Sequence, residues 1–122
     1  MIPGAGGTQR VPRLAGVTQD VMGFLMAGNP VSPKKAMAMG LINEVVEKEK
    51  LISSAKKYIL DGGKAVQPWD EKGFKLPGGA PYTPKGMMIW AAASSSLRKM
   101  SYGNYPAQKA ILSAIYEGVQ VP

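Results

Sequence analysis

The sequence contains neither cysteine nor histidine. Without cysteine there is no disulfide framework, and without both residue types there is no zinc site built from their sulfur and nitrogen ligands. A catalytic Ser-His or Cys-His pair within the chain is excluded for the same reason. The absence of cysteine is compatible with a reducing cytosol, and we expect a cytoplasmic protein.

Long apolar runs are missing as well. The apolar stretches at residues 21–27 and 87–93 are far shorter than the roughly 20 residues that a membrane-spanning helix needs. Met1 is followed closely by Pro3 and Gly4, which does not fit a signal peptide. The sequence therefore predicts no membrane insertion.

The overall composition is that of one globular domain. The chain has 122 residues, of which 45% are hydrophobic and 19% charged, with a net charge of +7. Basic residues are spread along the chain, which favours solvated helix faces and argues against a nucleic-acid partner. An anionic ligand such as coenzyme A is the sharper alternative, and its phosphates would meet basic side chains of the second half of the chain, namely Lys85, Arg98, Lys99 and Lys109.

The pattern of apolar residues and helix-start signals predicts a mainly α fold of about six helices. Ser32-Pro33 and Tyr105-Pro106 are typical helix starts, and Gly28 and Gly40 are typical helix ends. The β-branched run at 41–46 predicts one strand or short extended segment. The expected organisation is a helical region at 1–63, a Pro/Gly/Trp loop at 64–84, and a two-helix region at 85–122.

Two groups of apolar side chains have both a structural and a functional reading. Trp69, Phe74 and Tyr82 lie in the long loop, and we expect their rings to pin that loop to a surface. Met22 and Met26, with Met37 and Met39, have helical spacing, which favours core positions over an adaptable acyl-binding face. Met87 and Met88 are interpreted in the same way.

A family resemblance rests on two sets of motifs. The run from Pro3 to Arg10, with Ser32-Pro33-Lys34-Lys35-Ala36 and Gly40-Leu41-Ile42 in the same order, resembles the segment that follows the active-site carboxylate in enoyl-CoA hydratases of the crotonase family. The runs at 65–70 and 73–79 resemble one bacterial type of multifunctional fatty-acid oxidation protein. There, such a segment links the hydratase domain to an NAD-dependent 3-hydroxyacyl-CoA dehydrogenase domain. The resemblance thus implies the C-terminal part of a hydratase domain with its linker.

The resemblance also implies which groups of the hydratase reaction this chain would supply and which it would not. Hydration of a 2-enoyl-CoA needs two backbone N–H groups at the thioester oxygen and a pair of glutamates that move protons. In the family these groups precede the glycine turn and would fall before Met1, so the chain is expected to contain no catalytic residue. The backbone at Gly4 and Ala5 is the implied substrate-binding element, with the Gly4 N–H on the catalytic water.

The same resemblance implies which ligands to expect. Acyl-CoA is the implied substrate, and no covalently bound cofactor and no metal is expected. Gly4-Ala5-Gly6-Gly7 is not a dinucleotide fingerprint, because Gln9 stands where the third glycine belongs, so no NAD site is expected.

Three hypotheses follow from these observations. The first is a hydratase-derived chain that is inactive alone or active only with the missing half of the hydratase. The second is a non-catalytic helical module that self-associates or binds a partner through uncovered apolar faces. The third, a basic nucleic-acid binder, ranks last because aromatic and basic residues do not interleave. Whether the isolated chain has enzymatic activity is left open.

Overall fold

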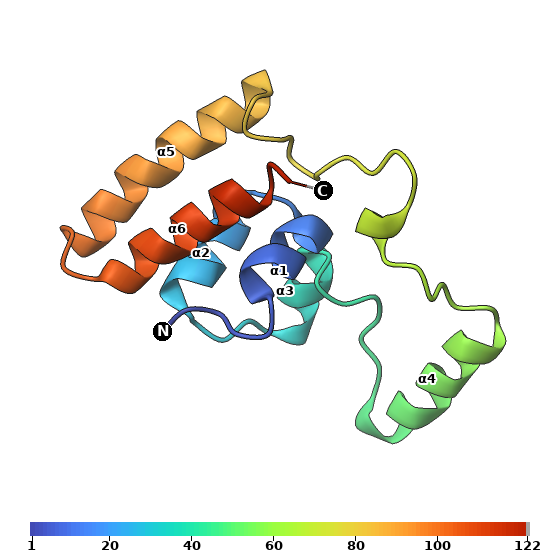
Figure 1. Ribbon diagram of the computed structural model, residues 1–122. Helices are drawn as coiled ribbons and strands as arrows, with labels where there is room; N and C mark the ends of the chain where they lie inside the picture. The colour runs from blue at the N-terminus through green and yellow to red at the C-terminus, as the bar shows by residue number, and fades with distance from the viewer. Residues whose placement is uncertain (122) are drawn as a thin grey trace.

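The computed structural model describes residues 1–121, and within this range it is helical without a strand (Figure 1). The helices, in chain order, are α1 (Gly7–Ala15), α2 (Gln19–Ala27), α3 (Pro33–Ala38), α4 (Leu51–Leu60), α5 (Pro84–Ser101) and α6 (Pro106–Gly118). Two 3-10 turns, η1 (Lys48–Lys50) and η2 (Pro68–Asp70), lie in the connections. The prediction of a mainly α fold with about six helices is confirmed.

The helices begin where the start signals in the sequence predict. The Ser32 hydroxyl accepts a hydrogen bond of 3.4 Å from the Lys35 backbone N–H, and Pro33 and Pro106 are each the first residue of their helix. Helix α5 begins at Pro84, with Thr83 as its N-cap, one residue earlier than the predicted start of the two-helix region at residue 85. The division of the chain at residues 63 and 84 stays a prediction.

The β-branched run at 41–46 forms an irregular connection between α3 and η1. The extended-segment reading fits this path, whereas the strand reading is wrong. A strand is stable only when its backbone pairs with a neighbour, and no other strand exists within residues 1–121. The β-propensity of these residues is therefore not sufficient for a strand, because no neighbouring strand is present in residues 1–121 to pair with.

The core is built around α6. This helix contacts α1, α2 and α5, and Figure 1 shows α5 lying alongside it in an antiparallel pair. Ile111 and Ile115, one helical turn apart on α6, are 1% and 0% exposed. Val21 and Leu25 of α2 and Leu97 of α5 belong to the same buried cluster.

In contrast, α4 lies apart from the helical body (Figure 1). Within the described part of the chain, the only element that it contacts is η1, which directly precedes it. Its apolar side chains face solvent: Ile52 is 66% exposed, Ile59 71% and Leu60 84%. The amphipathic helix predicted for this segment exists, but nothing in residues 1–121 covers its apolar face.

Two glycines of α2 provide a matched test of helix energetics. A Cβ atom at Gly23 or at Gly28 would meet nothing within 4 Å, but only Gly28, the C-cap, has a positive φ, of 68°. We expect Gly23→Ala to raise the free energy of unfolding by about 0.5–1 kcal/mol, because alanine loses less backbone entropy in a helix. Gly28→Ala should lower it by about 1 kcal/mol, because an alanine in the left-handed region is strained. Urea unfolding of both variants checks the opposite signs, and equal signs would contradict the assigned helix end.

Candidate functional site

The glycine turn at the start of α1 offers free backbone donors. The Gly7 N–H donates to the Gly4 carbonyl at 2.9 Å, and Ala5 and Gly6 have φ angles of 49° and 76°. Gly4 and Ala5 are exposed, and within residues 1–121 neither donates its backbone N–H to a recorded acceptor. These two N–H groups are therefore available to water or a ligand, as the predicted role requires.

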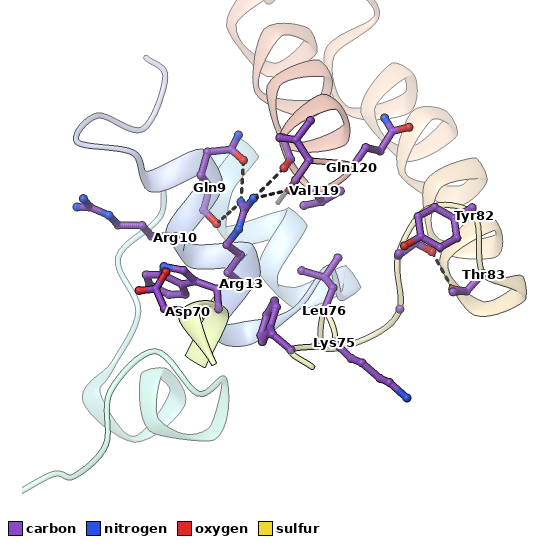
Figure 2. A pocket seen from close by; sticks show the side chains of 16 residues that line it. Gln9, Arg10, Arg13, Asp70, Lys75, Leu76, Tyr82, Thr83, Val119 and Gln120 are labelled. Carbon is purple, nitrogen blue, oxygen red and sulfur yellow. Dashed lines mark hydrogen bonds between the residues drawn. The ribbon is translucent and has the colours of Figure 1, made fainter. Parts of the chain in front are cut away.

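Arg10 connects this turn to the first helix. Its Nη1 donates to the Ala5 carbonyl at 3.2 Å. Beyond Arg10 a pocket of about 1160 Å³ opens between α1, the loop that follows η2, and the end of α6 (Figure 2). Gly4 and Ala5 do not line this pocket, so the structure places the predicted backbone site beside it and not within it.

The wall of the pocket is held by Arg13 and Gln9 of α1. Arg13 Nη1 donates to Gln9 Oε1 at 2.9 Å, and Arg13 Nη2 donates to the carbonyls of Gly118 at 2.9 Å and Val121 at 3.1 Å (Figure 2). Gln9 Nε2 donates to the Ala114 carbonyl at 2.8 Å. These donors satisfy carbonyl groups at the end of α6, where a positive charge is also favoured by the helix dipole. Arg13 thus has a structural role, which sequence periodicity gives no means to detect.

The long loop is anchored on the helical body by two of its three rings. Trp69, Phe74 and Tyr82 all line the pocket, and the first two are partly buried. Tyr82 is 76% exposed, so nothing in residues 1–121 covers its ring, and its contact with a surface outside this range stays a prediction. A hydrogen bond of 3.2 Å from the Val17 N–H to the Pro77 carbonyl fixes the loop to the α1–α2 connection. A Cβ atom at Gly16 would lie 2.5 Å from that same carbonyl oxygen, which explains the glycine there.

A second cavity, of about 390 Å³, lies between α2 and α5. We call it the methionine groove; its lining residues are Gln19, Met22, Gly23, Met26, Met88, Ile89, Ala92, Ala93, Ser96 and Met100. Met22 and Met26 are 2% and 7% exposed, so their predicted core position is confirmed, whereas Met88 is 75% exposed and its core interpretation is wrong. The core interpretation is also wrong for Met37 and Met87, which are 45% and 58% exposed, whereas Met39 is partly buried against the core. None of these three side chains lines the groove.

The carboxylates do not form a buried acid–base pair within the described residues. All eight acidic residues are exposed, and Asp70 is the one that lines the large pocket. No group of three or more acidic side chains in residues 1–121 converges as a metal site would require. None of the helices in this range combines the length and apolarity of a bilayer crossing.

A family model and individual related proteins point to the same family. The family model for enoyl-CoA hydratase/isomerase matches residues 1–61. The chain is 34% identical over 122 residues to the fatty acid oxidation complex subunit alpha of Shewanella baltica, covering 98% of this chain and 17% of that protein. It is 36% identical over 121 residues to the subunit of the same name from Shewanella amazonensis, with the same coverages.

These matches cover both halves of the chain. The family model spans the glycine turn and the helices up to α4, and the similarity to the alpha subunits continues through the loop, α5 and α6. The chain spans only 17% of the length of those relatives. The resemblance seen in the motifs is confirmed, and the chain belongs to the enoyl-CoA hydratase/isomerase family.

Proposed function

We propose that the chain acts as the C-terminal helical part of an enoyl-CoA hydratase unit in fatty-acid β-oxidation, in the cytoplasm. Its contribution is the exposed turn in which the N–H groups of Gly4 and Ala5 are free to donate. This observation carries the proposal, because the family match includes the turn and the reaction needs a positioned water beside the enoyl-CoA.

The proposal assigns the proton transfers to glutamates outside these 122 residues. A general acid or base must reach the proton that it moves, and the chain's carboxylates are exposed rather than gathered beside the turn. The Gly4 N–H would orient the attacking water. Polypeptide outside these 122 residues would supply the general acid, the general base and the N–H donors to the thioester oxygen. Acyl-CoA is the substrate in this proposal, without a metal or a bound cofactor.

A segment exchange tests this function. The part of the Shewanella baltica subunit that the chain matches is replaced by the chain, and hydration of crotonyl-CoA is measured for the parent, the chimera and the chain alone. We expect the chimera to hydrate and the chain alone not to. Within the chimera, Gly4→Pro removes the N–H and should lower kcat about tenfold by misplacing the water.

Gly4→Ala is the matched control in the same chimera, because it keeps the N–H and its Cβ would meet nothing within 4 Å. It should leave kcat near that of the unmodified chimera. A folded but inactive chimera beside an active parent would overturn the proposed function. Hydration by the chain alone would overturn the assignment of proton transfer to other polypeptide.

A non-catalytic interaction or oligomerisation module is the second candidate. The observation that favours it is the uncovered apolar face of α4, with Ile52 and Ile59 mostly exposed. Such a face would bind a second copy of the chain or the missing part of the hydratase. A concentration-independent, compact monomer in light scattering would count against self-association.

A further inference from the structure

The glycine turn at the start of α1 is held in a strained conformation. Ala5 has a φ angle of 49°, and a residue with a Cβ atom adopts this left-handed region only when its surroundings hold it there. The turn is exposed, and the hydrogen bond of 2.9 Å from the Gly7 N–H to the Gly4 carbonyl closes it. The direction of the Gly4 and Ala5 N–H groups therefore depends on what fixes the first residues of α1.

Gln9 joins this turn to the far half of the chain. Its backbone N–H donates to the carbonyl of Gly6, the N-cap of α1, at 2.9 Å. Its side-chain Nε2 donates to the Ala114 carbonyl of α6 at 2.8 Å, across 105 positions of sequence. One residue thus contacts the turn with its main chain and α6 with its side chain.

The side-chain amide of Gln9 is fixed in one orientation. Its Oε1 accepts a hydrogen bond of 2.9 Å from Arg13 Nη1 (Figure 2), while its Nε2 donates to Ala114. A flipped amide would point Oε1 at the Ala114 carbonyl and Nε2 at the guanidinium, so that acceptor would face acceptor and donor would face donor. Only a side chain that both donates and accepts can make these two contacts at once.

Gly118 leaves room for this amide. It is the last residue of α6, one helical turn after Ala114 and so on the same face. Gly118 has no positive φ, so its backbone conformation does not require glycine. A Cβ atom there would collide with Oε1 and Cδ of Gln9. Glycine weakens a helix relative to alanine, and here the space that it leaves is occupied by the Gln9 side chain.

We propose that Gln9 is a positioning residue for the glycine turn. By fastening the first turn of α1 to α6, its side chain holds the glycine turn in the conformation that directs the Gly4 and Ala5 N–H groups. The C-terminal half of the chain thereby supports a turn that lies at the N-terminal end. The support of the turn rests on the contacts of Gln9, whereas its effect on the attacking water, and so on turnover, rests on the proposed function.

Amide hydrogen exchange, measured by NMR on the 122-residue chain, tests the support of the turn directly. Gln9→Ala should raise the exchange rate of the Gly7 N–H about fivefold. The reason is that the bond from Gly7 to the Gly4 carbonyl opens more often once α1 is released from α6.

Gln108→Ala is the matched control. Gln108 of α6 also donates its Nε2 to a distant carbonyl, that of Met26 on α2, at 3.2 Å. The lost bond is of the same kind, but it joins α6 to α2 and not to α1. The variant therefore reproduces a general loosening of the helices, and it should leave the Gly7 exchange rate within about twofold of the native rate.

Gly118→Ala reaches the same contact from the side of α6. The added Cβ atom displaces the Gln9 amide, so this variant should raise the Gly7 exchange rate about as much as Gln9→Ala does. In the double variant the rate should be no higher than in either single variant, because the side chain that Gly118→Ala displaces is already absent. Two independent effects on stability would instead add.

The segment-exchange chimera extends the test to turnover. There, Gln9→Ala should lower kcat for crotonyl-CoA about fivefold and leave KM within about twofold, because the turn orients the water and does not hold the thioester. Gly118→Ala should lower kcat in the same way, whereas Gln108→Ala should leave both constants unchanged.

Three results would overturn the proposal: an unchanged Gly7 exchange rate in Gln9→Ala, an equal rise in Gln108→Ala, or additive rises in the double variant. The exchange measurement needs no catalysis, so it decides about the turn even beside an inactive chimera, which overturns the proposed function alone. An active chimera whose kcat is unaffected by Gln9→Ala overturns the role of Gln9 in turnover.

Discussion

Replacing Ile115 with alanine is expected to lower the free energy of unfolding by about 3 kcal/mol, within the roughly 2–5 kcal/mol observed for such core truncations. Ile115 is 0% exposed and lies on α6, the helix that contacts α1, α2 and α5. Removing three carbon atoms there loses apolar burial and leaves a cavity that three neighbouring helices cannot all close. Urea denaturation monitored by circular dichroism measures the change, which is a large part of the roughly 5–15 kcal/mol that holds a domain folded.

Ile59→Ala is the matched control for that substitution. Ile59 also lies within a helix, but it is 71% exposed on α4, and we expect a change within about 0.5 kcal/mol in either direction. A loss above about 1 kcal/mol would show that α4 is covered in solution, since only a buried side chain has that much burial to lose. That outcome would favour the interaction module. A small effect of Ile115→Ala would contradict the position of α6 at the centre of the core.

The helices could be predicted from the sequence because their signals are local. Ser32-Pro33 and Tyr105-Pro106 mark helix starts within two residues, and Gly28 marks an end by adopting a left-handed conformation. Periodicity also indicated which face of each helix is apolar. It could not indicate what covers that face, and α4 shows the difference, because its pattern is amphipathic although nothing in residues 1–121 packs on it.

In the candidate site, too, local features could be predicted from the sequence and contacts between distant segments could not. The turn at Gly4 and Ala5 was identified from its motif, and the structure adds that both N–H groups are free. The methionine groove could not be derived from spacing alone. Met22 and Met88 are far apart in the chain, and only the packing of α2 against α5 brings them to one cavity. The strand alternative for residues 41–46 was wrong for a related reason, since strand pairing depends on distant segments, whereas the extended-segment alternative fits.

The contact that most depends on distant segments is made by Arg13, and its removal is the second large effect that we expect. Arg13→Ala should lower the free energy of unfolding by about 2 kcal/mol, because hydrogen bonds from a charged donor contribute roughly 1.5–3 kcal/mol and a cation at a helix C-terminus adds some tenths more. The lost bonds include those to the carbonyls of Gly118 and Val121, at 2.9 and 3.1 Å, which join residues more than 100 positions apart.

Two further variants separate geometry from charge in this contact. Arg13→Lys keeps the positive charge but cannot bond Gln9 and the end of α6 at once through a planar fork, so it should recover only part of the loss. Arg10→Ala removes a single exposed bond to the Ala5 carbonyl at 3.2 Å and should change stability by less than about 0.5 kcal/mol. If Arg13→Ala were as mild as Arg10→Ala, the guanidinium group would not be needed to hold α6 against α1. The packing around Ile111 and Ile115, together with the hydrogen bond from Gln9 to the Ala114 carbonyl, would then be sufficient for that contact.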